Sequence, residues 1–137
     1  MSTVTVNFPG GVVVDATYKG HTVRTDQPLQ AGGTDSAMSP FDLLFASMAT
    51  CMGFYALRFC QERSLSTEGL HLTLEPVRDE EAKRVTLVRV ALDLPHDFPE
   101  KYRTAIERAV DHCAVKKALL DPPRFELTVN SGGAVTA

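Results

Sequence analysis

The chain has 137 residues, a net charge of -3, and charges of both signs mixed along its length. It is long enough to bury a hydrophobic core, and the lack of a basic patch or tail excludes the usual pattern of a nucleic-acid binder. The three cysteines are too few and odd in number for a disulfide scaffold. We expect one domain over residues 1–137 in the reducing cytoplasm, without a signal peptide.

The first quarter of the chain alternates apolar and polar residues, which is the pattern of β-strands. Three strands are predicted, at residues 4–6, 12–18 and 21–25. Only Lys19 and Gly20 separate the last two strands, so these two should form a tight hairpin. Residues 27–38 are rich in turn-forming side chains and are predicted to be a loop.

A long helix is predicted from Pro40 to about Glu62. It begins with a serine cap at Ser39, a proline at the first helical position and an acid at Asp42. The uncharged run from Leu43 to Leu57 is shorter than the roughly 20 residues that a membrane-spanning helix needs. Because the helix is apolar nearly all round, it should lie in a core or an interface and not in a membrane.

The second half of the chain predicts two strands, two helices and a last strand. The two strands have a period of two and a charged turn between them, so they should pair antiparallel with one face in solvent. A second helix should start near Asp97 and carry an apolar stripe that ends at Cys113. A short helix from Ala114 to Leu120 and a strand from Arg124 to Val129 follow. The order βββαββααβ predicts an α+β fold.

The three cysteines differ in their predicted surroundings. Residues on a helix advance by about 100° each, so Cys60 points away from Cys51 and is predicted to be structural. Cys113 lies near a helix start, where backbone N–H groups would lower its pKa. Burial would raise the pKa of Cys51, which then needs a cation, and Arg24 and Arg58 are the candidates. From spacing alone, the cysteines also fit small buried hydrophobic residues.

Two segments resemble the cysteine motifs of the OsmC/Ohr family. Residues 32–57 (GGTDSAMSPFDLLFASMATCMGFYAL) are similar to its Gly-Gly-x-Asp-Ser loop, Ser-Pro helix start and mid-helix cysteine. Residues 111–120 (DHCAVKKALL) are similar to its second cysteine motif. The predicted order of strands and helices agrees over nearly the whole chain.

The resemblance implies an intertwined homodimer with the long helix buried at its centre and with active sites formed by both subunits. In the peroxidase members the first cysteine attacks an organic hydroperoxide and becomes a sulfenic acid, which the second cysteine resolves as a disulfide. These roles would fall to Cys51 and Cys113, in an oxidative stress response. No metal or organic cofactor is implied. A dithiol reductant, a lipoylated protein in the best-known members, would restore the thiols.

One position departs from the peroxidase members. They carry a glutamate directly after the proline that starts the long helix, and this chain has Phe41 there. Asp42 is about 100° further round the helix and is predicted to belong to the cap. Lys19 and Arg24 lie near the family's arginine region, but neither is assigned the role of its catalytic arginine. The chain therefore resembles the less characterised OsmC-like branch more closely.

Two other functions remain open on the sequence. One is an OsmC-like protein without peroxidase activity that binds a small apolar ligand at the dimer interface. Its pocket would be formed by Phe41, Met48, Phe54 and Tyr55. The other is a structural interaction domain, which would be favoured if no pocket reached Cys51. His112, beside Cys113, is a candidate proton acceptor. The histidines and cysteines lack the spacing of a zinc site, so no metal is predicted.

Overall fold

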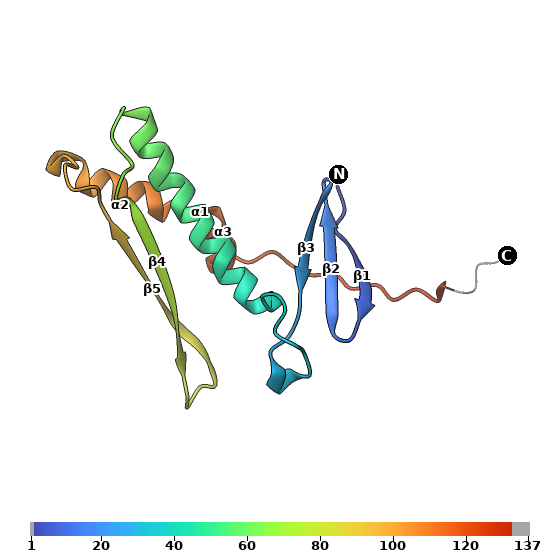
Figure 1. The fold of residues 1–137 in the computed structure, drawn as a ribbon. Helices are drawn as coiled ribbons and strands as arrows, with labels where there is room; N and C mark the ends of the chain where they lie inside the picture. Colours follow the sequence, from blue (N-terminus) through green and yellow to red (C-terminus); the bar gives the residue numbers. More distant parts are fainter. Residues whose placement is uncertain (1, 133–137) are drawn as a thin grey trace.

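The computed structural model describes residues 2–132 (Figure 1). These residues form a three-stranded sheet, a two-stranded sheet and three α-helices. The strands are β1 (Thr5–Gly10), β2 (Val13–Tyr18), β3 (His21–Thr25), β4 (His71–Asp79) and β5 (Arg84–Asp93). The helices are α1 (Pro40–Glu62), α2 (Arg103–Asp111) and α3 (Ala114–Leu120), with 3₁₀ turns η1 (Leu29–Ala31) and η2 (Glu100–Tyr102). The predicted α+β class is confirmed.

The N-terminal sheet is an antiparallel meander in the order β1-β2-β3. The ladder between β2 and β3 closes at the pair Tyr18 and His21. Between them, Lys19 and Gly20 have φ angles of 50° and 81°. A two-residue turn with both residues left-handed matches the twist of the flanking strands. The predicted hairpin is confirmed.

Helix α1 begins and ends where side chains satisfy free backbone groups. The backbone N–H of Asp42 donates to Ser39 Oγ at 3.2 Å, and Pro40 occupies the first helical position. At the other end Arg63 donates from Nη1 to the carbonyl of Phe59 at 3.2 Å. Its guanidinium also lies 3.6 Å from the centre of the Phe59 ring. The predicted span of this helix is confirmed.

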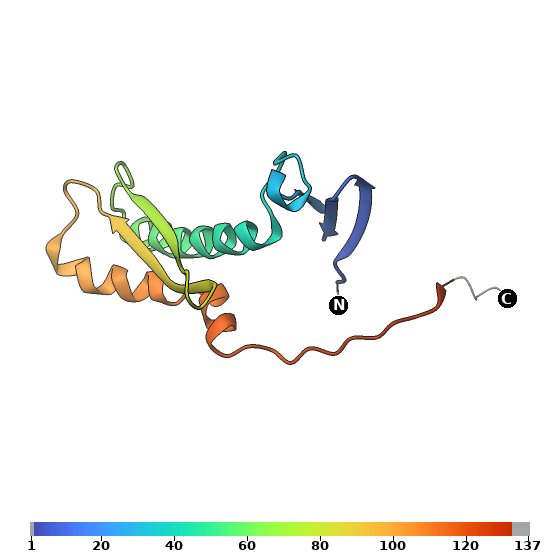
Figure 2. The same ribbon diagram turned by 90° about the horizontal axis from the view of Figure 1, so that it is seen from below.

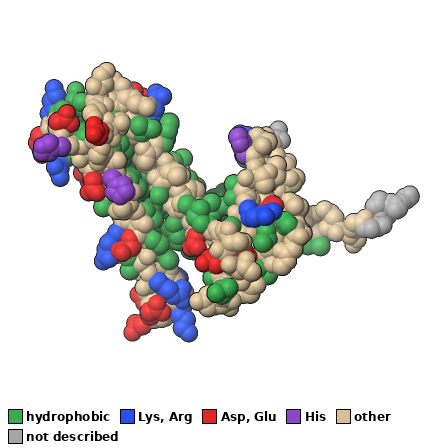
Figure 3. All heavy atoms as spheres, viewed as in Figure 1, with side chains coloured by type: hydrophobic (Ala, Val, Ile, Leu, Met, Phe, Trp, Pro, Cys, Tyr) green, Lys and Arg blue, Asp and Glu red, His purple; other side chains and the backbone are tan. Residues whose placement is uncertain are grey.

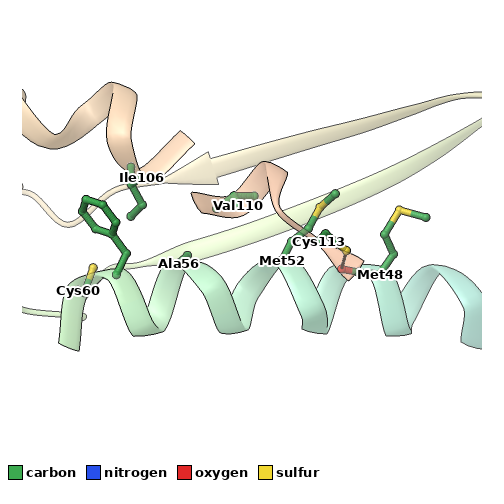
Figure 4. Close-up of a cluster of buried hydrophobic side chains, with 8 residues drawn as sticks. Met48, Met52, Ala56, Cys60, Ile106, Val110 and Cys113 are labelled. Atoms are coloured by element: carbon green, nitrogen blue, oxygen red, sulfur yellow. Dashed lines mark hydrogen bonds between the residues drawn. The ribbon is translucent and has the colours of Figure 1, made fainter. Parts of the chain in front are cut away.

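The hydrophobic core lies where α1 meets β4, α2 and α3 (Figures 2 and 4). The β4–β5 pair is antiparallel, as predicted, and Leu72, Leu74 and Leu92 pack partly buried against the core. The core residues are Met48, Met52, Ala56, Phe59, Cys60, Ile106, Val110 and Cys113. Burial raises the pKa of Cys60, which is the behaviour of an inert structural thiol.

The predicted start of the second helix at Asp97 is wrong. Asp97 lies within a turn in which the N–H of Phe98 donates to the carbonyl of Pro95 at 3.0 Å. A 3₁₀ turn, η2, then leads into α2 at Arg103 without a side-chain cap. A capping side chain acts only when it lies next to the first free N–H groups of a helix. Here η2 separates the capping pattern at Asp97 from the first N–H groups of α2.

The predicted strand from Arg124 to Val129 is also wrong for the single chain. The segment leaves α3 and runs away from the other elements without a neighbouring strand (Figure 2). A strand needs such a neighbour for its N–H and C=O groups. Phe125, Leu127 and Val129 are 87%, 91% and 87% exposed, so an apolar set with a period of two faces solvent.

Large apolar surfaces remain uncovered in the single chain. The N-terminal sheet stands apart from the helical body, and hydrophobic side chains are exposed on both parts (Figure 3). By length and composition α1 passes the test for a membrane-spanning helix, a test that core helices of soluble proteins also pass. Only 28% of its most apolar window is buried within the chain. Exposed apolar surface on this scale is typical of surfaces that contact another protein or a membrane.

Candidate functional site

Cys51 and Cys113 come together at the junction of α1 and α3. Cys51 lies in the middle of α1 and is half-buried, while Cys113 is fully buried and forms the N-cap of α3. A hydrogen bond links the two thiols. The Cys113 sulfur also lies 3.9 Å from the carbonyl oxygen of Met48, against α1 (Figure 4). The structure therefore brings together the two cysteines that the sequence singled out.

The pKa of Cys51 is lowered, which is the reverse of what burial in an apolar helix predicts. Desolvation is the largest single influence and acts to raise it. Hydrogen bonds from the Val115 backbone, the Cys113 side chain and the Ala114 backbone together outweigh it. The first N–H groups of α3 thus donate hydrogen bonds to a thiol on the neighbouring helix. No arginine contributes among the described residues.

Cys113 has a raised pKa, although the sequence predicts a lowered one. Desolvation is again the largest influence, and here it prevails. The N–H of Lys116 donates to Cys113 Sγ at 3.3 Å and acts in the opposite direction. The hydrogen bond and the charge of Cys51 raise the pKa further. The pair therefore favours one thiolate, on Cys51, with the Cys113 thiol as its donor.

Arg24 is held in a bidentate ion pair on the N-terminal sheet. Its Nε and Nη2 atoms each lie 2.8 Å from a carboxylate oxygen of Asp15, the residue opposite it on β2. This hydrogen bond lowers the pKa of Asp15, against the opposing effect of burial. The Arg24 side chain is still 56% exposed. β3 lies beyond the N-terminal end of α1 (Figure 1), and Arg24 is not among the groups that shift the pKa of Cys51.

The other two auxiliary candidates also lie away from the Cys51 thiol. Arg58 is two turns further along α1, about 10 Å along the helix axis, and pairs with Glu62 at 3.1 Å. His112 ends α2, and its Nδ1 atom lies 3.3 Å from Lys117 Nζ. Neither residue contributes to the lowered pKa of Cys51.

The four predicted pocket residues lie at three separate places. Met48 lines a groove of about 830 Å³ between α1, β5, α2 and α3. Phe54 and Tyr55 line a second groove, of about 640 Å³, between α1 and α2. Phe41 is exposed at the start of α1, where its ring packs edge-on against Phe45 with centroids 5.3 Å apart. Within the single chain these residues do not line one shared pocket, and the predicted pocket at a dimer interface stays a prediction.

Sequence reasoning missed Asp26, which organises the loop before α1. This carboxylate is only 2% exposed and accepts hydrogen bonds from both the backbone N–H and the hydroxyl of Thr34 and of Ser36, and from the N–H of Gln27. Bonds from Ser36 are the main reason that its pKa lies well below the usual range. These bonds hold the loop from Asp26 to Ser36 in one conformation, and we call this loop the clasp.

Gly33 completes this clasp and explains part of the Gly-Gly-x-Asp-Ser pattern. A Cβ atom on Gly33 would lie 1.9 Å from the carbonyl oxygen of Gln27 and 2.8 Å from Oδ1 of Asp26. Only glycine fits such a close backbone approach. The glycine pair is visible in the sequence, but there it indicates only a loop over residues 27–38 and not a close backbone contact.

Comparisons with known proteins agree with this fold. The sequence model described as OsmC-like protein matches residues 33–128. A search of curated proteins gives no match.

Three solved structures cover most of this chain. A Psychrobacter arcticus 273-4 protein named for osmotic stress induction and the detoxification response is 24% identical, with a TM-score of 0.73, over 86% of this chain and 88% of that one. An OsmC-like protein of unknown function from Vibrio cholerae has 10% identity and a TM-score of 0.65, over 86% and 92%. The organic hydroperoxide resistance protein OsmC of Legionella pneumophila has 18% identity and a TM-score of 0.58, over 87% and 88%.

Proposed function

Because the chain belongs to the OsmC-like protein family, we propose that it is a thiol-dependent peroxidase that reduces organic hydroperoxides. The observation that carries this proposal is that α1 and the start of α3 bring the half-buried Cys51 against the buried Cys113, where the pKa of Cys51 is lowered and that of Cys113 is raised. A thiolate is the nucleophilic form of cysteine, and a second thiol in contact with it can trap the oxidised product. Organic hydroperoxide resistance proteins among the structural neighbours fit such a redox role.

The first step is attack by the Cys51 thiolate on the outer oxygen of the hydroperoxide. The O–O bond breaks, a new S–O bond forms, and the alkoxide leaves with a proton as an alcohol. Cys51 is oxidised by two electrons to a sulfenic acid. The N–H groups of Ala114 and Val115 stabilise the negative charge on sulfur before attack.

The second step is resolution by Cys113. Its sulfur attacks the sulfur of the sulfenic acid, the S–O bond breaks, and the hydroxide leaves with the Cys113 proton as water. Cys113 is in place for this step because it already contacts the Cys51 thiol. A dithiol, such as the lipoyl group of a cytoplasmic lipoylated protein, then exchanges with the disulfide and is itself oxidised. No metal or organic cofactor takes part.

The active form in this proposal is an intertwined homodimer with α1 at its centre. Three features support a second copy: the exposed α1, the distant N-terminal sheet and the unpaired C-terminal segment. Arg24 of the partner subunit would supply the cation that Cys51 lacks in its own chain. Asp15 orients this arginine. Asp15 can therefore take the role of the glutamate of the peroxidase members, whose position is occupied by Phe41 in this chain.

Hydroperoxide consumption with dihydrolipoamide as the reductant tests the proposal. Cys51→Ser should abolish turnover of cumene hydroperoxide because it removes the nucleophile. Cys60→Ala is the matched control: this thiol is buried on the far side of the core and has a raised pKa, so turnover should be unchanged. Retained turnover in Cys51→Ser would show that another group reacts. No turnover in the wild-type protein would instead favour the alternative, an apolar-ligand protein without peroxidase activity, for which the open grooves beside α1 are the supporting feature.

A further inference from the structure

The junction between α2 and α3 lies against α1 at Cys113 (Figure 4). α2 ends at Asp111, and α3 begins at Ala114, directly after Cys113. The carbonyl of Cys113 accepts a hydrogen bond from the N–H of Lys117 at 3.0 Å, and its sulfur accepts one from the N–H of Lys116 at 3.3 Å. The first turn of α3 is therefore built on the residue that contacts Cys51.

α3 has few contacts of its own that would fix its position. It is seven residues long, and none of these residues is buried. A helix of this length is not stable alone in water, so it depends on contacts with other elements. Its first turn matters for the cysteine site because the N–H groups of Ala114 and Val115 donate to the Cys51 thiol. Any contact that holds this turn also positions these two donors.

Two side-chain contacts cross the junction from α2 to α3. Lys116 Nζ forms an ion pair with Asp111 Oδ1, and Lys117 Nζ lies 3.3 Å from His112 Nδ1. Asp111 is the last residue of α2, where the free carbonyl groups of the helix disfavour a carboxylate. The hydrogen bond from Lys116 is the main reason that the pKa of Asp111 is lowered, and His112 and Lys117 are the other charged or titratable groups that act on it. The ion pair therefore compensates for an unfavourable position on α2.

We infer that Asp111 is a positioning residue for the thiolate of Cys51. Its ion pair with Lys116 holds the first turn of α3 in the orientation in which the first N–H groups of that helix point at the thiol. Asp111 is not among the groups that act directly on Cys51. The side chains of the pair are 68% and 35% exposed, so the pair should contribute little to overall stability. Its effect should instead appear on the thiol.

The pH midpoint for alkylation of Cys51 by iodoacetamide tests the inference on the full-length protein, with peptide mass spectrometry as the readout. Asp111→Asn should raise this midpoint by about 0.2 to 0.7 of a pH unit, which is the strength of an exposed ion pair expressed as a pKa shift. Charge alone predicts the opposite sign, because removal of a nearby negative charge lowers the pKa of a thiol. Asp111→Glu keeps the carboxylate and should stay close to wild type.

A double-mutant cycle checks that the two side chains act together. Lys116→Gln should raise the midpoint by as much as Asp111→Asn does. The double variant should show no larger rise than either single variant, because the second substitution removes a partner that is already lost. Rises that add in the double variant would mean that the two residues act separately, and would overturn the inference.

Glu107→Gln is the matched control. Glu107 is an exposed acid one turn before Asp111 on α2, and among residues 2–132 the ion pairs include none to it. Its midpoint should equal that of wild type. In every variant Cys113 should remain the slower thiol, which shows that α3 still packs against α1. The inference is overturned by an unchanged or lower midpoint in Asp111→Asn, by an equal rise in Glu107→Gln, or by rapid alkylation of Cys113.

The inference deepens the proposed function and rests on it only for the use that the thiolate is put to. Alkylation is measured without hydroperoxide, so the two claims can fail separately. A raised midpoint in Asp111→Asn, together with a wild-type protein that does not turn over cumene hydroperoxide, would refute the peroxidase and support the positioning role. Turnover in wild type with no shift in Asp111→Asn would refute the positioning role and leave the peroxidase.

Discussion

At the scale of single residues, the main finding is that one helix N-terminus acts on the thiol of another element. Cys113 is the residue that caps α3, yet the pKa of Cys51 is the one that falls. Desolvation decides the difference, because Cys113 is completely enclosed and Cys51 is not. Cys51 should therefore be the more reactive thiol, and Cys113 should act as its hydrogen-bond donor.

The pH dependence of alkylation tests this assignment. Cys51 should react with iodoacetamide with a midpoint below the value of about 8.5 for a free cysteine, and Cys113 with a midpoint above it. Peptide mass spectrometry reports each site separately. Cys113→Ala removes a hydrogen-bond donor, so the midpoint of Cys51 should rise in that variant. Faster alkylation of Cys113 than of Cys51 at neutral pH would reverse the assignment.

At the scale of elements, the clasp built on Asp26 joins the N-terminal sheet to α1. The carboxylate accepts bonds from Gln27, Thr34 and Ser36, and the N–H of Asp26 donates to the Met38 carbonyl at 3.3 Å. The loop therefore has a defined path from β3 to Ser39. This path sets where the sheet stands relative to the helix.

Asp26→Asn should lower the melting temperature, because an amide places N–H groups where hydrogen-bond donors now point. Asp35→Asn is the matched control, because Asp35 is an exposed aspartate of the same loop with the left-handed φ of 55° that asparagine also adopts. It should melt as wild type does. The pKa of Asp26 is lowered, so its contribution to stability is present at neutral pH and is lost only as the pH falls below the usual aspartate range. Equal melting of both variants at pH 7 would contradict the clasp.

Sequence patterns correctly predicted those elements whose formation depends on interactions between residues close in the sequence. The cap at Ser39, the turn at Lys19 and Gly20, and the alternation in β4 and β5 all depend on neighbours in the sequence. Patterns could not predict which way the N–H groups of α3 point, because that depends on the packing of α3 against α1. The sequence therefore singled out the two cysteines that the fold brings together but exchanged the directions of their pKa shifts.

At the scale of the whole molecule, the single chain leaves its termini unpacked. The N-terminal sheet and the C-terminal segment each carry exposed apolar side chains, among them Phe8 and Leu127. The predicted last strand failed because no strand lies beside this segment among the described residues of the chain. A second copy would cover α1 and give the segment a neighbour, which accounts for its apolar residues in every second position.

Analytical ultracentrifugation should therefore find a stable dimer at micromolar concentration. Leu127→Glu would be harmless in a lone chain, where this side chain is 91% exposed. In the dimer it should raise the dissociation constant roughly a hundredfold or more, because each of the two buried leucines contributes about 1.5–3 kcal/mol. Thr128→Glu, on the other side of the extended segment, is the control and should change little. A folded wild-type monomer at this concentration would refute the dimer.

The most direct test of the central claim is the product that hydroperoxide forms on the protein. After a small excess of cumene hydroperoxide, peptide mass spectrometry should find an intramolecular disulfide between Cys51 and Cys113. In Cys113→Ser the reaction should stop at a sulfenic acid on Cys51 that dimedone traps. Both thiols still reduced after prolonged exposure would contradict the peroxidase account.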